Sequence, residues 1–339
     1  MRKNRPHFNI PIFLPAEGCR FRCVFCNQHY ISGKEAFPTI DDVEQTILRH
    51  LQTFYTSEAD VEIAFFGGNF TGLSHTRQKQ LLDLACFYID KGVVDGIRLS
   101  TRPDFIDEEE LRFLREYPVK TIELGAQSFD DHVLRKSGRG HTSNDIYKAS
   151  YLIRNFGFEL GLQMMTGLPG DTAKGALFTA EEIIRMGAGC TRIYPCLVIK
   201  DTALESLYRR GLYQPQSLEE AVRLAAQLII KFEEASVKIL KVGLHPAEGF
   251  ISGNTLIAGP FHPAFREMAE TLIWKKILED NISYDSSSTH LTITTSPQQM
   301  AKAAGFKAYN HKWLNKSFKH VHFIADPLLK NREYSISYH

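Results

Sequence analysis

Short apolar segments alternate with amphipathic segments along the first two thirds of the chain, and this order constrains the fold more than any other feature. Each apolar run suits a buried strand, and a segment with helical spacing follows it. Such alternation indicates a parallel sheet with helices packed outside it. The pattern predicts an α/β fold, a partial (β/α)6 barrel of the TIM type, over residues 10–212. The predicted strands are Ile10–Leu14, Val61–Phe66, Ile97–Thr101, Thr121–Leu124, Glu159–Met165 and Thr191–Tyr194.

Glycine-rich and polar segments come directly after most of these predicted strands. In barrels of this kind the loops at the carboxyl ends of the strands carry the chemistry, because parallel strands bring those ends to one mouth. We therefore expect the segments to converge on a single site, which is a stronger signal than any one glycine motif. They are Cys19–Cys26, Gly67–Phe70, Arg102–Asp104, Gly125–Ser128 and Thr166–Gly170.

The alternation ends near residue 212, and the pattern after it is mixed. A long amphipathic segment (Ser217–Ala235) and a candidate further strand (Val237–Leu244) precede a region that suits a small α/β unit. We therefore predict two domains. A core barrel occupies residues 1–235, and a C-terminal α/β extension that could bind substrate or RNA occupies residues 236–339.

The extension is basic and aromatic between Leu291 and Ala325, where five lysines occur without any acidic residue. This composition suits RNA, through contacts to phosphates and stacking on bases. The alternative is an ordinary solvated face whose aromatic residues lie in the core. The interleaved aromatic residues are Phe306, Tyr309, Trp313 and Phe318.

The overall charge and the hydropathy argue against two kinds of partner. Lys+Arg 40 and Asp+Glu 39 give a net charge of +1, so no global field attracts nucleic acid or anionic lipid. No apolar run approaches the ~18 residues that a membrane span needs. The basic start of the chain is not followed by the apolar region of a signal peptide. We expect a soluble, cytoplasmic protein without membrane contact.

Three cysteines, Cys19, Cys23 and Cys26, stand four and three residues apart directly after the first predicted strand. Thiolates are the preferred ligands of iron–sulfur clusters. Three of them on one loop can hold three irons of a [4Fe-4S] cluster, which leaves the fourth iron open to an external ligand. The alternative is a zinc site with His29 as the fourth ligand. The other three cysteines (Cys86, Cys190 and Cys196) are scattered in apolar surroundings and are expected in the core.

The spacing CxxxCxxC, with Phe25 before the last cysteine, resembles the signature of the radical S-adenosylmethionine (SAM) superfamily. The resemblance implies that the amino and carboxylate groups of SAM chelate the open iron. It implies reductive cleavage of SAM to a 5′-deoxyadenosyl radical, fed by an external electron donor of the flavodoxin or ferredoxin type. In such enzymes the cofactor supplies the radical chemistry, and the protein supplies orientation and protection.

Two glycine segments resemble cofactor-binding segments of this superfamily. Gly67, Gly68 and Asn69 are similar to the Gly-Gly motif that receives the SAM amino group, although the family often has Glu where Asn69 stands. The segment that begins at Gly167 resembles the one against which the adenine packs. The alternatives are a turn that ends a strand and a turn that enters a helix.

Three polar residues near the fourth predicted strand are further candidates for SAM binding. Glu123 and Gln127 flank the end of this strand, where a carboxylate could accept hydrogen bonds from ribose hydroxyls or the SAM amino group. The alternative is a buried Glu123 paired with Arg102 or Arg139. Arg139 could instead hold the SAM carboxylate, because its guanidinium suits bidentate binding.

Several segments together resemble the radical-SAM half of the Elongator catalytic subunit (elongator protein 3). The resemblance spans residues 10–225 and implies modification of the wobble uridine of tRNA. By this analogy Tyr194 and Lys200 lie at the substrate end of the mouth, as candidate catalytic residues. The first two cysteines stand closer together than in that subunit, and the chain ends without room for its acetyltransferase domain. The segments are Ser100–Asp104, Glu123–Ser128, Gly138–Thr142 and Ile193–Lys200.

The sequence therefore predicts a radical SAM enzyme that removes hydrogen from a substrate, with a tRNA or other RNA nucleoside as the first candidate. One alternative is a radical SAM enzyme that acts on a small metabolite. The other is a non-catalytic iron–sulfur or zinc module that binds RNA.

Overall fold

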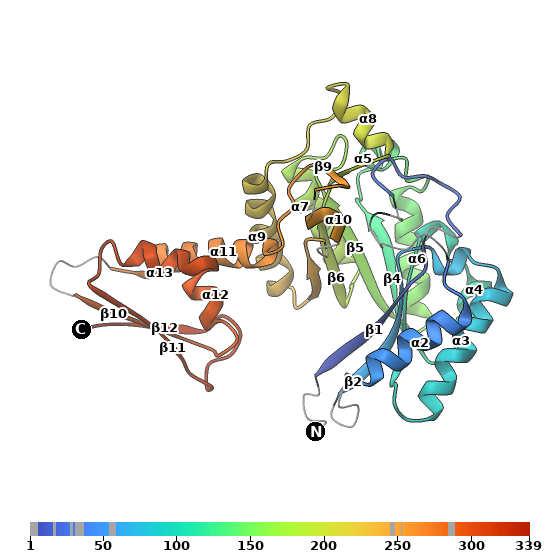
Figure 1. Cartoon of the computed structure of the whole chain (residues 1–339), viewed down its shortest axis with the longest axis horizontal. Coiled ribbons are helices and arrows are strands. Elements are labelled where there is room, and N and C mark those ends of the chain that lie inside the picture. The colour runs from blue at the N-terminus through green and yellow to red at the C-terminus, as the bar shows by residue number, and fades with distance from the viewer. Residues whose placement is uncertain are drawn as a thin grey trace. The chain divides into compact units, whose positions relative to one another are not determined.

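The computed structural model describes residues 6–15, 18–27, 30, 37–53, 59–244, 248–251, 253–283 and 289–339 (Figure 1). The chain divides into two compact units. We name Met1–Gln216 with Phe232–Pro260 the barrel unit, and Ser217–Lys231 with Phe261–His339 the C-terminal unit. Helix α9 (Leu218–Glu234) runs from one unit into the other. In the part of the chain that the structure describes, no helix has both the length and the apolar character to cross a membrane.

The barrel unit is built on one seven-stranded sheet in which all neighbouring strands are parallel. The predicted α/β fold, a partial TIM-type barrel with a C-terminal extension, is confirmed. The candidate seventh strand is present as β8, so the barrel unit extends past the predicted limit at residue 235. In sheet order the strands are β1 (His7–Phe13), β2 (Asp60–Phe66), β3 (Gly96–Thr101), β4 (Val119–Gln127), β5 (Glu159–Thr166), β6 (Cys190–Pro195) and β8 (Lys238–Val242).

Helices follow most strands of this sheet, and polar N-caps fix where several of them begin. Thr39 and Asp42 form a reciprocal capping box at the start of α2, and Asp107 caps α4. The helices are α2 (Ile40–Leu51), α3 (His75–Asp90), α4 (Glu108–Arg115), α5 (Asp131–Lys136), α6 (Ser143–Asn155), α7 (Ala173–Arg185), α8 (Ala203–Arg209) and α10 (Glu248–Ile251), with short 3₁₀ turns η2 (Phe70–Gly72) and η3 (Pro103–Phe105).

The core lies between the sheet and these helices. Every residue of β3 is buried, and Ile63, Ile97 and Ile122 are fully buried on adjacent strands. Burial of such side chains contributes about 1.5–3 kcal/mol each. Near the mouth, a two-stranded antiparallel ribbon of β7 (Val198–Ile199) and β9 (Leu256–Ala258) follows β6 and β8 in the chain.

The C-terminal unit contains a three-stranded sheet in the order β11-β10-β12. Leu278, Leu291, Ile293, Leu314, Phe318 and Val321 form its core, with Trp313 packed against them. Phe318 is thus a core residue, as the structural alternative predicted, whereas Tyr309 is 52% exposed. The elements are α11 (Phe265–Asn281), β10 (His290–Thr295), α12 (Met300–Ala304), η4 (Phe306–Ala308), α13 (Tyr309–Leu314), β11 (His320–Ala325) and β12 (Tyr334–Tyr338).

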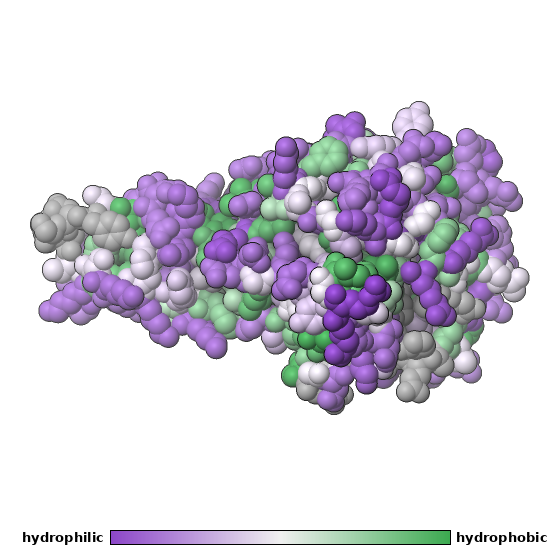
Figure 2. All heavy atoms as spheres, turned by 90° about the horizontal axis from the view of Figure 1, so that it is seen from above, coloured by the Kyte–Doolittle hydropathy of each residue, from purple (hydrophilic) through white to green (hydrophobic). Residues whose placement is uncertain are grey.

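Hydrophilic residues cover most of the molecular face seen in Figure 2, and apolar residues appear there only in small groups. Scattered apolar residues of this kind are usual on protein surfaces and identify no partner.

Candidate active site

The loop that follows β1 carries the three cysteines. Cys19 is exposed, Cys26 is half-buried and Cys23 is buried. The backbone N–H of Cys26 donates to the carbonyl oxygen of Cys23 at 3.1 Å, so a tight turn separates these two. Of the remaining cysteines, Cys190 and Cys196 are buried in the core as expected.

Asn69 holds the start of this loop in place. Its side-chain Nδ2 donates to the carbonyl oxygen of Gly18 at 2.9 Å, and its Oδ1 accepts from Thr101 Oγ1 at 2.6 Å and from the backbone N–H of Arg102 at 3.1 Å. The side chain is 1% exposed. This arrangement joins the cysteine loop to the ends of β2 and β3, and it leaves only the backbone of Asn69 for the predicted cofactor contact.

Gly18 is required where the loop approaches the segment after β2. Its φ of +85° is a conformation that side chains rarely adopt, and a Cβ there would lie 2.7 Å from the carbonyl carbon of Gly72. Backbone therefore packs on backbone one residue before Cys19. This close approach was not predicted from the sequence.

Further contacts hold the rest of the loop. The N–H of Val24 donates to Ser137 O at 3.0 Å, and Val24 O accepts from the N–H of Leu204 at 2.7 Å. The ring of Phe21 packs against Gly140, where an added Cβ would lie 2.5 Å from the ring. The cysteine loop is thus fixed by segments that follow β4 and β6 as well as by those after β2 and β3.

Arg139 lies against the cysteines. Its Nη1 donates to Cys23 Sγ at 3.2 Å, and its Nη2 donates to the carbonyl oxygen of Gly125 at 2.5 Å. Its Nε is buried and has no partner. A guanidinium in this position can stabilise a thiolate, and its remaining N–H is open to an anionic group.

Gln127 ends β4 in a left-handed conformation, with φ of +66°. Its Oε1 is buried and has no hydrogen-bond partner. A buried amide oxygen without a donor is unfavourable unless a ligand or water supplies one. This orphaned acceptor suits a hydroxyl donor such as a ribose group.

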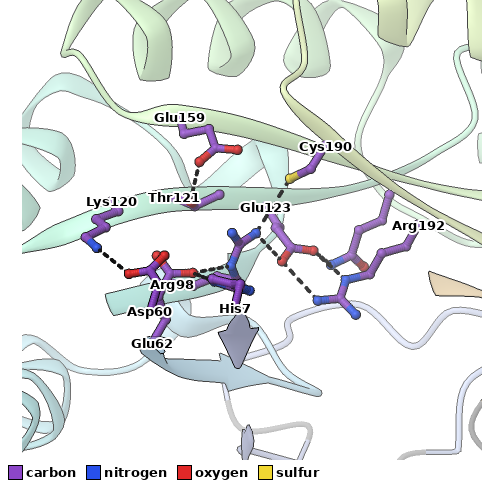
Figure 3. A network of polar contacts seen from close by, with 11 residues as sticks. His7, Asp60, Glu62, Arg98, Lys120, Thr121, Glu123, Glu159, Cys190 and Arg192 are labelled. Carbon is purple, nitrogen blue, oxygen red and sulfur yellow. Dashed lines mark hydrogen bonds and ion pairs between the residues drawn. The ribbon is translucent and has the colours of Figure 1, made fainter. Parts of the chain in front are cut away.

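Glu123 is 1% exposed and belongs to an ion network inside the barrel (Figure 3). Its carboxylate accepts from Arg192 Nε at 2.6 Å, Arg98 Nη1 at 3.1 Å and Gln163 Nε2 at 3.0 Å. The alternative prediction, in which Glu123 pairs with Arg102 or Arg139, is wrong. The Arg102 side chain bonds to Asp104 and to the backbone of Arg139, and the Arg139 side chain faces Cys23.

The electrostatics of this interior network keep its carboxylates charged. Burial alone would raise the pKa of Glu123, but the Arg192 and Arg98 guanidinium groups lower it. Burial likewise opposes ionisation of Glu62, yet its hydrogen bond with His7 and the charge of Arg98 lower its pKa to about 2. The network is therefore a set of satisfied charges across β2, β3, β4 and β6.

The two glycine segments occupy the carboxyl ends of β2 and β5. Gly67 has φ of +88°, and Gly68 follows it half-buried. Gly167 has φ of +73°, and a Cβ there would lie 2.7 Å from Gln216 Oε1. The backbone N–H of Gly167 donates to Asp171 Oδ2 at 2.9 Å.

Asp171 and Tyr213 support the turn at Gly167, and neither residue was predicted from the sequence. Burial raises the pKa of Asp171 to about 6. The hydroxyl of Tyr213 donates to Gly167 O at 2.7 Å. The spacing between Tyr213 and Gly167 follows no local pattern, so only the fold brings them together.

The two candidate catalytic residues lie at the end of β6 and after it. Tyr194 is half-buried, and burial raises the pKa of its phenol. Lys200 is exposed, and its backbone carbonyl accepts from Asn27 Nδ2 at 3.2 Å. Lys200 therefore lies beside the cysteine loop, whereas Tyr194 is a strand-end residue next to Met165 of β5 in register.

The donor set fits an iron–sulfur cluster bound through three thiolates. Among the described residues, no group of three or more Cys, His, Asp and Glu side chains is already arranged around a metal position. His29, the fourth ligand of the zinc alternative, lies outside the described residues. The orphaned Arg139 Nε and Gln127 Oε1 are one donor and one acceptor that a bound cofactor with carboxylate and hydroxyl groups would satisfy.

Residues 13–183 match the family described as the Radical SAM superfamily, and residues 189–275 match the Radical_SAM C-terminal domain. Because the first match covers half of the chain, the chain belongs to the radical SAM superfamily. Its relatives include proteins named tRNA uridine(34) acetyltransferase and Elongator complex protein 3, in agreement with the resemblance to elongator protein 3.

Three similar proteins match different shares of the chain. Heme chaperone HemW of Bacillus subtilis is 27% identical over 60% of this chain and 55% of its own length. The tRNA uridine(34) acetyltransferase of Methanocaldococcus jannaschii is 33% identical over 37% of this chain and 24% of its own length. The structure of Methanocaldococcus infernus Elp3 aligns with a TM-score of 0.64 at 19% identity, over 81% of this chain and 64% of that one. The chain thus spans about half of the Bacillus relative and about a quarter of the archaeal acetyltransferase.

Proposed function

We propose that the chain is a radical SAM enzyme whose cluster is held by Cys19, Cys23 and Cys26, and whose substrate is a nucleoside in tRNA or another RNA. The observation that carries the proposal is the position of the cysteine loop. Contacts with segments that follow four strands hold this loop at the mouth of the barrel. A bound cluster with SAM supplies one-electron cleavage of the sulfonium bond and a radical that abstracts hydrogen.

The residues of this chain have separate tasks at that mouth. The backbone of Gly67 and Gly68 would hold the amino end of SAM, and the guanidinium of Arg139 would hold its carboxylate. Gln127 Oε1 would accept a hydrogen bond from a hydroxyl group, and the turn at Gly167 would present a backbone surface to the adenine. Glu123 contributes through the rigidity of the strands it ties together rather than by direct contact.

Two observations support RNA as the substrate class. One relative is named a tRNA uridine(34) acetyltransferase. In the C-terminal unit, Lys275 lies 5.9 Å from the ring of Tyr309 and 5.8 Å from the ring of Trp313, so a cation stands beside two aromatic faces. Such a group suits a phosphate next to a stacked base. Tyr194 and Lys200 are proposed to act on the substrate.

A small molecule is the second candidate substrate, because another relative is named a heme chaperone. One assay separates the two. The chain is reconstituted anaerobically with iron and sulfide, reduced, and given SAM with either bulk tRNA or a metabolite extract. Formation of 5′-deoxyadenosine is followed by chromatography.

The expected result is 5′-deoxyadenosine from the wild type and none from Cys26→Ala. We expect tRNA to stimulate it, and nucleoside mass spectrometry of the tRNA should reveal a new modified nucleoside. Stimulation by the extract alone would support the small-molecule candidate. An intact cluster that neither binds nor cleaves SAM would reject the enzymatic proposal and favour the non-catalytic RNA-binding module.

A further inference from the structure

A polar cavity of about 450 Å³ lies at the open edge of the large sheet. His7 and Asn9 of β1 line it on one side, and Lys238, Ile239 and Leu240 of β8 line it on the other, with Arg192 of β6 between them. Strands β1 and β8 are the two ends of the sheet order and do not pair with each other. The cavity therefore occupies the gap that a partial barrel leaves, and its volume is within the range of small-molecule sites.

This cavity is separate from the cysteine loop. His7 is the first residue of β1 and Lys238 is the first residue of β8, so the cavity lies at the amino ends of the strands. The cysteines follow the carboxyl end of β1. Seven residues of extended strand span about 20 Å. A ligand in the cavity would thus be distinct from SAM at the mouth.

The lining of the cavity is basic. None of its six residues is acidic, and three of them (His7, Arg192 and Lys238) can carry positive charge. Arg192 is balanced by Glu123 in the bidentate contact seen in Figure 3, and His7 contacts Glu62 at 2.8 Å. Lys238 is exposed and has no carboxylate partner among the described residues. Of the three basic side chains, Lys238 is therefore the one whose charge is not balanced by a carboxylate, and this charge attracts an anion.

The position of Arg192 is fixed before any ligand arrives. Glu123 holds it through Nε and Nη2, and its guanidinium lies 4.6 Å from the centroid of the Phe66 ring. A group held on both sides in this way loses little freedom when a ligand binds. The wall of the cavity is consequently preorganised.

Asn9 indicates that a ligand in the cavity should also carry a hydrogen-bond donor. Its Oδ1 is buried and has no hydrogen-bond partner. A buried acceptor of this kind is satisfied by a donor, and none of the described protein groups supplies it. The half-buried side chains of Ile239 and Leu240 offer an apolar surface beside it.

We propose that this cavity binds a small molecule that carries an anionic phosphate or carboxylate group beside a hydroxyl. Lys238, supported by Arg192, faces the anion. Asn9 Oδ1 accepts a hydrogen bond from the hydroxyl group, and Ile239 and Leu240 contact the carbon skeleton. The proposal goes beyond the radical chemistry and does not depend on it.

Isothermal titration calorimetry of the full chain without SAM tests this site. The probes are ribose 5-phosphate for the phosphate arm, malate for the carboxylate arm, and uncharged ribose. We expect one of the two anions to bind and ribose to give no heat. Lys238→Gln should weaken that binding about tenfold or more. Lys120→Gln is the matched control, since Lys120 is an exposed lysine that pairs with Asp60 and does not line the cavity.

Asn9→Ala tests the hydroxyl contact in the same way. It should reduce the affinity for the hydroxylated anion toward that of inorganic phosphate or succinate, whose own binding should not change. Absence of binding by both anions at millimolar concentration would overturn the proposal, as would equal binding by wild type and Lys238→Gln. Because 5′-deoxyadenosine formation by Lys238→Gln is measured separately, failure of this site and failure of the proposed enzyme activity are distinguishable.

Discussion

The mouth of the barrel and the ion network in its interior are both polar and buried, but they are built in opposite ways. In the interior, Glu62, Arg98, Glu123 and Arg192 all have charged partners. At the mouth, Gln127, Ser137, Arg139 and His141 each keep a buried polar atom without a hydrogen-bond partner. Since buried polar groups are normally satisfied, the contrast indicates that the ion network serves the fold and that the mouth is completed by a ligand.

Removal of Glu123 should give the largest effect and would test the structural half of this comparison. Glu123→Ala leaves Arg98 and Arg192 buried without their shared carboxylate. Loss of one partner from a buried ion pair typically costs about 3–5 kcal/mol. Urea denaturation should therefore show a large drop in the free energy of unfolding. Glu219→Ala, which removes an exposed pair with Arg223, should leave stability nearly unchanged. Equal effects of the two would show that the network does not stabilise the barrel.

Gly18→Ala should be the next largest effect and acts at the mouth. Gly18 has a left-handed backbone conformation, and the added Cβ would lie 2.7 Å from the carbonyl carbon of Gly72. The cysteine loop must therefore move. We expect poor iron incorporation, measured as iron and sulfide per chain after reconstitution. The matched control is Gly92→Ala, because Gly92 has φ of +71° with open space around it. Gly92→Ala should lower the free energy of unfolding only by the cost of placing alanine in the left-handed conformation, about 1–2 kcal/mol. Full iron incorporation by Gly18→Ala would refute this account of the loop.

His141 should make stability depend on pH. Burial and the charges of Arg139 and Arg102 lower its pKa to about 2, so the folded chain keeps it neutral. The unfolded chain protonates it near pH 6.5, and stability therefore falls as the pH drops below 6.5. The maximum slope is about 1.4 kcal/mol per pH unit. Unfolding free energies of the apo chain from pH 7.5 to 5.5 should show this slope, and His141→Phe should reduce it. An unchanged slope in the variant would contradict the assignment.

Arg139→Gln should give the smallest effect. It tests whether the polar groups at the mouth act on a bound cofactor. A cationic hydrogen bond to Cys23 favours the more negative, reduced form of a bound cluster. Its loss should lower the midpoint potential, on the order of tens of millivolts for a one-electron couple. Redox titration followed by electron paramagnetic resonance measures this shift. Arg135→Gln, from the neighbouring helix α5, serves as the control. An unchanged potential in Arg139→Gln would limit Arg139 to a structural contact.

The sequence predicted the strands and the mouth well because both depend on local patterns. The six predicted strands occur at nearly the predicted residues, and the cysteine spacing identified the superfamily. Partners of buried charges were not predictable in this way. Glu123 meets Arg98 and Arg192, which are 25 and 69 residues away, because of strand register alone. The short helix α5 was also missed, since six residues give too little periodicity.

The place of β1 at the end of the sheet has a thermodynamic consequence. This strand pairs with β2 alone, so it has fewer hydrogen bonds to lose than an inner strand. Whatever binds to the cysteine loop that follows β1 stabilises the docked strand by mass action. Hydrogen exchange of β1 amides should therefore slow when iron is incorporated, which makes the first strand of the barrel a reporter of cofactor loading.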